Sequence, residues 1–306
     1  ALFTRLLEAV PTHAKIILMG DKDQLSAVQA GSVFSDICCV DGLKSHVFEL
    51  RHNFRSAGQP GIHFLSSAVK NAKIPQIKEA VRQARFPDIE FLDTAHINFH
   101  KHLTRIIKTQ FQPFITASSI DDALSKLDRF RILCAHNTGR FGTLSIHHFC
   151  EKILPSEGNS DMLAGQYNRI VMIKANDYEK QLFNGDTGVI KKGDGEKQLA
   201  YFKNEQGGKK VFSLPDLPVH EPGYAITVHK SQGSEFDTVL LLLPDTVSGI
   251  LTRQLLYTGI TRAKHKVIIA GRIEVIEKAA AQTTDRVSGL TQMLEKALSE
   301  TNEASG

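Results

Sequence analysis

The chain has 306 residues, of which 42% are hydrophobic and 23% are charged, and its formal net charge is +4. These values are ordinary for a globular protein with room for two domains and a small insertion, and they tolerate a nucleic-acid partner without demanding one. We expect neither a membrane span nor a signal peptide. Four cysteines favour small buried thiols in a reducing compartment over a disulfide framework: Cys38, Cys39, Cys134 and Cys150.

The N-terminal part predicts a helix, a strand and a second helix. Apolar residues recur on one side of an amphipathic helix over residues 1–11. The run Lys15 to Met19 (KIILM) predicts a short buried strand that stops at Gly20-Asp21, shortly before Gln24. The carboxyl end of such a strand is the usual place for ligand chemistry in an α/β sheet. The second helix is expected over Gly31 to Val40.

The next part carries weaker signals. Val47 to Leu50 predicts a strand that runs into Arg51 to Ser56 (RHNFRS), and Ile62 to Asn71 predicts a helix. Between Ala72 and Asp128, prolines interrupt each apolar pattern, so we expect short helices and loops there. The histidines at positions 96, 100 and 102 are expected to be solvated.

A clearer pattern returns at Arg131 to Ala135 (RILCA), which predicts a buried strand, and at Thr143 to Leu154, which predicts a helix. Within this helix His147, His148 and Cys150 raise the alternative of a metal site. Apolar residues at helical spacing place Cys150 on a buried face instead. We therefore expect no metal site in this chain.

Short strands punctuated by Gly and Asn turns occupy the stretch from Arg169 to Leu214, with NGDTG at residues 184–188 as one of the turns. This composition is typical of a small antiparallel barrel. Its lysines are equally compatible with phosphate contacts and with a solvated surface: Lys191, Lys192, Lys209 and Lys210.

The most specific string is TVHKSQGSEF, at residues 227–236. The aliphatic run Val239 to Leu243 follows it and predicts a parallel strand that is covered on both faces. A loop that combines hydroxyls, an amide, an ammonium, an imidazole and a glycine suits contacts with phosphates and bases better than a plain solvated turn. Further on we expect a strand over Lys266 to Ala270, then helices over Ile273 to Gln282 and Thr291 to Glu300, with fraying from Thr301.

Four strings, in this order, resemble motifs III to VI of the RecD-type superfamily 1 DNA helicases: GDKDQ at 20–24, RHNFRS at 51–56, TVHKSQGSEFD at 227–237 and YTGITRA at 257–263. The resemblance implies an α/β fold, namely a RecA-like (P-loop NTPase-like) second motor domain with a small SH3-like β-barrel insertion. It also implies five parts: 1–42 as the end of a first motor domain, 43–166 as the first part of the second, 167–221 as the insertion, 222–285 as the last part, and 286–306 as a C-terminal helix and tail.

The same resemblance implies roles for individual residues. The catalytic residues that it implies around the terminal phosphate of ATP are Gln24, Arg55 and Arg262. The nucleotide-binding residues that it implies are Gly20, Asp21, Gln24, Arg55, Gly233, Glu235 and Arg262. The DNA-binding residues that it implies are Thr227, His229, Lys230, Ser231, Gln232 and Thr258.

A phosphate loop of the form G-x-x-x-x-G-K-[ST] and an Asp-Glu pair for Mg²⁺ do not occur in the sequence. We therefore expect a C-terminal fragment of a longer subunit, inactive in ATP hydrolysis by itself. A natural degenerate paralogue is the alternative.

For the whole protein, the resemblance implies a 5′-to-3′ helicase subunit of exodeoxyribonuclease V that uses ATP and Mg²⁺. It would act in the cytoplasm on single-stranded and duplex DNA, with RecB-like and RecC-like partners and no membrane, in double-strand break repair and recombination. Three alternatives stay open: a free-standing RecD-like helicase, the helicase part of a conjugative relaxase, and a non-catalytic DNA-binding scaffold subunit.

Overall fold

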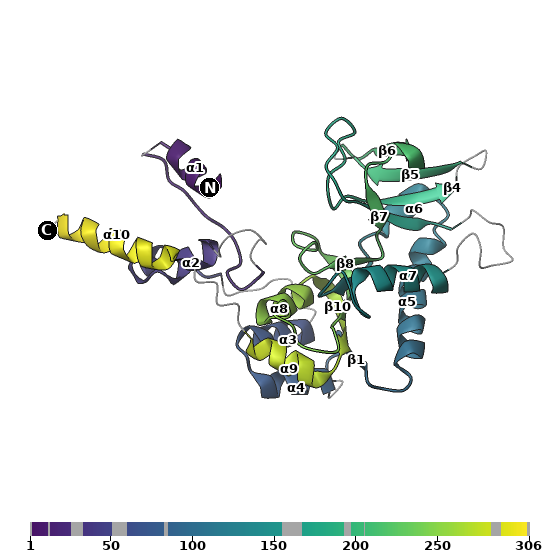
Figure 1. Ribbon diagram of the computed structural model, residues 1–306, viewed down its shortest axis with the longest axis horizontal. Coiled ribbons are helices and arrows are strands. Elements are labelled where there is room, and N and C mark those ends of the chain that lie inside the picture. Colours follow the sequence, from purple (N-terminus) through teal and green to yellow (C-terminus); the bar gives the residue numbers. More distant parts are fainter. Residues whose placement is uncertain are drawn as a thin grey trace. The chain divides into compact units, whose positions relative to one another are not determined.

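The computed structural model describes residues 2–11, 13–25, 33–50, 60–82, 85–154, 167–192, 197–204, 206–282 and 289–304. The chain divides into two compact units. One combines Ala1–Leu50 with Asp285–Gly306, and the other is Arg51–Thr284. Each unit is described by itself below (Figure 1).

The larger unit is built on a five-stranded sheet in which every described pairing is parallel. Its strands, in spatial order, are β1 (Ile89–Asp93), β10 (Ala263–Gly271), β9 (Phe236–Leu242), β2 (Phe130–Cys134) and β8 (Ala225–Thr227). Because β2 is buried along its whole length and β9 along most of it, the sheet is covered on both faces, as parallel sheets are. The strands predicted over Arg131 to Ala135, Val239 to Leu243 and Lys266 to Ala270 are confirmed.

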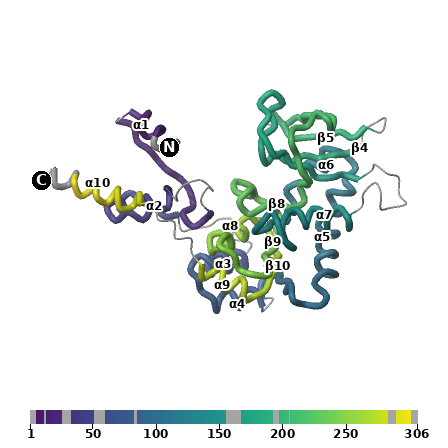
Figure 2. Tube along the Cα trace, viewed as in Figure 1, coloured from purple at the N-terminus to yellow at the C-terminus, as the bar shows by residue number. Residues whose placement is uncertain are grey.

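Helices form two groups beside this sheet (Figure 2). The first group packs together: α3 (Pro60–Lys70), α4 (Ile74–Arg82), α8 (Arg253–Thr261) and α9 (Ile273–Ala281). The second group joins α5 and α7 and places α6 against the second sheet: α5 (Phe99–Ile115), α6 (Ile120–Ser125) and α7 (Thr143–Ile153). This layering gives an α/β fold with a parallel sheet, and it confirms the predicted fold class at that level.

A second, antiparallel sheet is inserted between α7 and β8. Its order is β6 (Lys209–Ser213), β5 (Gln198–Lys203), β4 (Thr187–Lys192), β3 (Arg169–Ile173) and β7 (His220–Pro222), and the short 3₁₀ helix η3 (Leu214–Asp216) follows β6. It has its own small apolar core, made mainly by Val171, Ile173, Leu182, Ile190, Ala200 and Phe202. The short strands are thus confirmed. In the described residues the order runs openly from β6 to β7, so closure into an SH3-like barrel stays a prediction.

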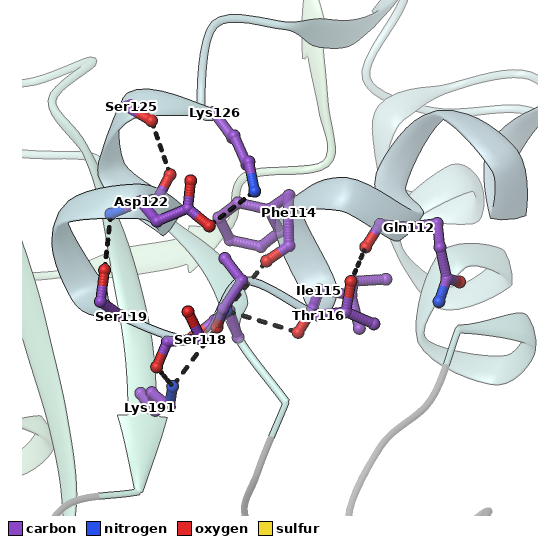
Figure 3. A network of polar contacts seen from close by, with 12 residues as sticks. Gln112, Phe114, Ile115, Thr116, Ser118, Ser119, Asp122, Ser125, Lys126 and Lys191 are labelled. Atoms are coloured by element: carbon purple, nitrogen blue, oxygen red, sulfur yellow. Dashed lines mark hydrogen bonds and ion pairs between the residues drawn. The ribbon is translucent and has the colours of Figure 1, made fainter.

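The inserted sheet is fastened to the connection between α5 and α6 (Figure 3). The Lys191 ammonium on β4 donates to the carbonyl of Ser118 at 3.3 Å and lies 3.5 Å from that of Ala117. The side chain of Asn168, just before β3, is buried and donates to the carbonyls at the end of α5. These donors join the insertion to the end of α5 and to the segment that follows it.

Buried Arg131 secures the return from the insertion to β8. Its guanidinium donates to the carbonyls of Gly223 and Leu127 and lies over the ring of Phe236, 5.0 Å from the ring centroid. Gly223 also donates its N–H to the Ile170 carbonyl. The chain therefore enters β8 from a fixed point. Burial lowers the pKa of Arg131 to about 10, which is still well above neutral pH, and the side chain therefore stays charged.

The smaller unit contains α1 (Leu2–Ala9), α2 (Val33–Cys39), the 3₁₀ helix η1 (Asp41–His46) and α10 (Leu290–Ala304). Helix α10 packs against α2 and η1. The predicted helices are confirmed here, but the predicted fraying from Thr301 is wrong in part, since α10 continues to Ala304.

Both strands predicted in this unit are wrong. Lys15 to Met19 and Val47 to Leu50 form no strand, and their apolar side chains are largely in solvent, with Met19 86% and Phe48 87% exposed. The physical reason is that the described part of this unit supplies no neighbouring strand and no apolar layer to cover either run.

The expectation of short helices and loops between Ala72 and Asp128 is wrong in part, although α4 and α6 are short helices. Strand β1 and the 17-residue helix α5 both lie there, and α5 contains Pro113. Proline removes one helical hydrogen bond. Here it lies in the last turn, and the buried stripe along α5, which includes Leu103, Ile107 and Phe111, outweighs that loss.

The cysteines separate into two pairs. Cys134 and Cys150 are buried, as expected, and burial raises the pKa of both thiols. Cys38 is half-buried and Cys39 is exposed, so the prediction of buried thiols is wrong for Cys39.

Candidate functional site

The turn at residues 228–235 connects opposite edges of the parallel sheet. It begins at the carboxyl end of β8, where Thr227 lies opposite Cys134, and it ends at the amino end of β9, where Phe236 lies opposite Ala263. Strand β9 has seven residues, so the two edges are about 20 Å apart at about 3.3 Å per residue. The sequence-predicted residues in this turn therefore divide into two groups.

At the carboxyl edge, Thr227 begins the turn. Its side chain is 7% exposed, and its hydroxyl accepts the backbone N–H of Lys230 at 3.3 Å. Ser231 is fully buried and donates its hydroxyl to the Val228 carbonyl at 2.7 Å. These two hydroxyls hold the turn in shape, and their predicted contacts with DNA stay predictions.

Three other polar side chains of the turn are at least partly accessible to solvent. His229 is half-buried, while Lys230 and Gln232 are exposed. Gly233 has a φ of +83°, a left-handed conformation that a side chain would strain. A glycine at this position therefore allows the chain to reverse between the exposed segment and β9.

At the amino edge, Arg262 links the end of α8 to the turn. Arg262 is 6% exposed, and its guanidinium donates to the carbonyls of Ser234 at 3.1 Å and Thr258 at 3.3 Å. Its backbone carbonyl accepts from Phe236 N–H at 2.9 Å. Thr258 is fully buried and Glu235 is half-buried. The structure thus brings Gly233, Glu235, Thr258 and Arg262 together at one edge.

The predicted residues near the start of the chain lie in the smaller unit. Gly20 follows the exposed run Lys15 to Met19, and the Asp21 carboxylate accepts from the Gln24 side-chain amide at 2.9 Å and from the Asp23 N–H at 3.0 Å. This small turn fixes the direction of the Gln24 amide. Arg55, the remaining predicted catalytic residue, lies outside the described residues.

Sequence analysis did not identify one charged group beside the carboxyl edge. The ammonium groups of Lys174 and Lys230 contact the two different oxygens of Glu221, at 3.2 Å and 2.9 Å. Burial opposes ionisation of Glu221, but the two lysines outweigh it and hold the pKa of the carboxyl below its ordinary value. Only Lys230 belongs to a recognisable motif, so no sequence signal singled out the other two.

The lysines of the inserted sheet have protein partners. Lys191 donates to carbonyls after α5, Lys209 pairs with Asp121 at 2.7 Å, and Lys210 donates to the Gln181 carbonyl at 2.7 Å. The side chain of Lys192 lies outside the described residues. Lys191 and Lys209 therefore fasten the insertion, and Lys210 bonds within it, roles that neither predicted alternative included.

Other kinds of site were searched in the same residues. Across the described ranges, no group of three or more His, Cys, Asp or Glu side chains is arranged to hold a metal ion. His147 is buried, and burial lowers its pKa to about 4. None of the described helices combines the length and the apolar character needed to cross a bilayer.

Two domain families match parts of the chain. The UvrD-like helicase C-terminal domain matches residues 222–270, which hold both ends of the turn, and the AAA domain matches residues 1–89. Curated relatives match nearly the whole chain. It is 33% identical over 302 residues to the RecBCD enzyme subunit RecD of Mycolicibacterium smegmatis, and 34% identical over 301 residues to that of Mycobacterium tuberculosis.

These matches cover 97% and 96% of this chain but 52% and 51% of the relatives, so the chain spans about half the length of the curated relatives it matches. A further relative is the ATP-dependent RecD2 DNA helicase of Deinococcus radiodurans, 28% identical over 97% of this chain and 38% of the relative. The resemblance to RecD-type helicases, inferred from four motifs, is thereby confirmed along the chain.

Proposed function

We propose that this chain, similar along its length to about half of a RecD subunit, is the C-terminal part of an ATP-dependent DNA helicase. The observation that carries the proposal is the turn at residues 228–235. One end displays Lys230 beside the carboxyl edge, and the other is bonded to Arg262 at the amino edge. A motor needs such a connection between a nucleic-acid track and a nucleotide site.

The nucleotide side of the proposal keeps the residues that the motifs imply. Arg262 carries a permanent, planar charge that can hold two phosphate oxygens, and Gln24 and Arg55 are the other proposed contacts with the terminal phosphate. Gly20, Asp21, Gly233 and Glu235 contact other parts of ATP. Neither the phosphate loop nor the Asp-Glu pair that would hold Mg²⁺ occurs in this sequence, so this chain alone does not hydrolyse ATP.

The nucleic-acid side is the carboxyl edge. There Thr227, His229, Lys230, Ser231 and Gln232 are the proposed contacts with a single strand, through phosphates and stacked bases. Thr258, at the amino edge, is the remaining proposed contact. Since backbone contacts dominate such binding, the affinity should depend strongly on salt.

The architecture and setting complete the proposal. The inserted sheet at 167–221 is an SH3-like module, flanked by the parts of the second motor domain at 43–166 and 222–285, with 1–42 and 286–306 outside it. The longer protein moves 5′ to 3′ on DNA in the cytoplasm with RecB-like and RecC-like subunits, in double-strand break repair. A free-standing helicase is the second candidate, favoured by the similarity to a RecD2 helicase.

The test of the DNA side compares two lysine variants. Lys230 and Lys78 each make an ion pair at 2.9 Å, with Glu221 and Glu277 respectively, but Lys78 lies on α4, away from the turn. Lys230→Ala should weaken binding of labelled oligo(dT) and make the slope of log affinity against log salt shallower by about 0.7, the value for one phosphate contact on a single strand. Lys78→Ala should change neither. Equal affinity and equal salt dependence of the two variants would contradict the proposed nucleic-acid track.

A further inference from the structure

The charged group formed by Lys174, Glu221 and Lys230 joins the insertion to the turn. Lys174 follows β3, Glu221 lies on β7, and Lys230 lies in the turn after β8. Each ammonium takes its own carboxylate oxygen, at 3.2 Å for Lys174 and 2.9 Å for Lys230. Two positive charges therefore converge on one small anionic group.

The group is arranged so that its anion can be exchanged. The side chains of Lys174 and Lys230 are 43% and 33% exposed, and that of Glu221 is 19% exposed. Ion pairs with this exposure contribute little net stability, because water screens the attraction and the long side chains lose freedom. Two ammonium groups that hold two carboxylate oxygens are also spaced to hold two oxygens of a phosphate.

We propose that Lys174 and Lys230 form a binding site for a nucleic-acid phosphate, and that Glu221 occupies this site as an internal competitor when no nucleic acid is bound. The proposal rests on the proposed function, since the carboxyl edge must carry the strand. It adds Lys174, and with it the inserted sheet, to the nucleic-acid track.

Other lysines of the insertion do not compete for this role. Lys191 and Lys209 are held at the junction with α5 and α6 by carbonyls and by Asp121. Among the insertion lysines with described side chains, Lys174 is the one that shares an anion with the turn. The inserted sheet thus has one side fastened to the helices and one charged contact with the candidate track.

The test removes the charge of the competitor and keeps its shape. In Glu221→Gln, both lysines become available to phosphate, so oligo(dT) should bind more tightly at low salt. For each additional phosphate that the variant binds, the slope against log salt should steepen by about 0.7, so that raising salt from about 50 to 200 mM costs about 2.6-fold more affinity than in the unmodified chain. Glu90→Gln is the matched control, because Glu90 also pairs with a lysine, Lys266 at 2.6 Å, on the far strand of the sheet.

The double variant Lys174→Gln with Glu221→Gln should lose part of the increase in affinity, which assigns that part to Lys174. If Glu221→Gln binds DNA as Glu90→Gln does while Lys230→Ala still weakens binding, the competitor role is wrong and the proposed function stands. If Lys230→Ala also has no effect, the proposed function fails. The shift in melting temperature on addition of tripolyphosphate then tests the anion site separately from DNA binding. A rise in melting temperature larger in Glu221→Gln than in Glu90→Gln would keep the anion site but exclude nucleic acid as its ligand, and equal rises would remove the site.

Discussion

Asn168 offers a sharp test of how the insertion is attached. Its side chain is 99% buried, and its amide nitrogen lies 2.9 Å from the Phe114 carbonyl, 3.1 Å from that of Ala117 and 3.4 Å from that of Ile115. Its side-chain oxygen is buried and has no hydrogen-bond partner among the described residues. The site therefore suits a side chain that donates to carbonyls, and it provides no donor for a side-chain oxygen.

Two substitutions at this residue separate lost bonds from added charge. Asn168→Ala removes the buried donor that these carbonyls share, while each carbonyl keeps one backbone or lysine donor, so the change should cost about 0.5–1.5 kcal/mol of unfolding free energy. Asn168→Asp also places a carboxylate against these carbonyls at the negative end of α5. An uncompensated buried charge should bring the loss to about 3–5 kcal/mol at neutral pH.

The two variants should also differ in their response to pH. Burial and the facing carbonyls raise the pKa of the introduced carboxyl above its unfolded value, because they disfavour its charged form. A raised folded-state pKa gives stability that is present at low pH and lost as the pH rises. The deficit of Asn168→Asp relative to Asn168→Ala should therefore grow as the pH rises above about 4, the pKa of Asp in the unfolded chain.

Urea unfolding followed by circular dichroism measures these differences as shifts in midpoint at constant slope. Asn71→Asp is the control, because the Asn71 amide also donates to a helix carbonyl, Ser67 at 2.9 Å, but on the surface. That change should cost less than about 1 kcal/mol. An Asn168→Asp variant as stable as Asn168→Ala at neutral pH, or with no dependence on pH, would refute the reasoning.

Three further outcomes are expected. Burial lowers the pKa of His147 to about 4, below its unfolded value, so its contribution is complete above about pH 6.5 and is lost toward pH 4; His147→Met should flatten that part of the unfolding profile by on the order of 3 kcal/mol. Arg262→Ala and Arg262→Lys should each lower DNA-stimulated hydrolysis by the longer helicase by about 10³–10⁵-fold, and loss of nucleotide binding or of the fold would contradict that role. Gly142→Ala should lower the melting temperature more than Gly139→Ala, because a Cβ at 142 would clash with the Thr138 backbone. A Cβ at 139 meets no atom, so its cost is only the strain of a side chain at positive φ, about 1–2 kcal/mol.

The strands of the parallel sheet could be predicted where a continuous apolar run marks them in the sequence. Val239 to Leu243 is continuous, aliphatic and bounded by polar residues, and such a run has few structures open to it. It forms most of β9 between β10 and β2. The same reasoning succeeded for Arg131 to Ala135, since both runs find neighbouring strands within the same unit.

Apolar runs failed as predictors where the neighbours were lacking. Lys15 to Met19 has the same composition as the confirmed strands, yet Met19 and Ile17 are mostly exposed. Strand formation is a property of a pair of segments, and the sequence of one segment does not reveal whether a partner lies beside it. Helix α5 shows the reverse error. Pro113 favoured an interrupted segment in the sequence, but the structure has one long helix whose buried stripe packs in the core.

The candidate site was predictable in its motifs and not in its partners. The string at residues 227–236 indicated a polar turn after a strand, and the structure has that turn. A lysine in sequence has no visible partner, so Lys191 and Lys209 were considered for phosphate contacts and Lys174 was not. Three-dimensional structure separates them, since the first two bond to the junction with α5 and α6, and the third shares Glu221 with the turn.

The turn at residues 228–235 connects the proposed nucleic-acid contacts at one end with the proposed nucleotide contacts at the other. Its carboxyl-edge end is held by Lys230, through the backbone N–H to Thr227 and the ammonium to Glu221. Its amino-edge end is held by Arg262 through the Ser234 carbonyl. If the proposed function holds, a nucleic-acid strand that displaced Lys230 from Glu221 and a phosphate that displaced Arg262 from Ser234 would pull on the same short segment. Because the buried Ser231 hydroxyl bonds to the Val228 carbonyl, any coupling between the two ends would have to pass through a segment that is held in its middle.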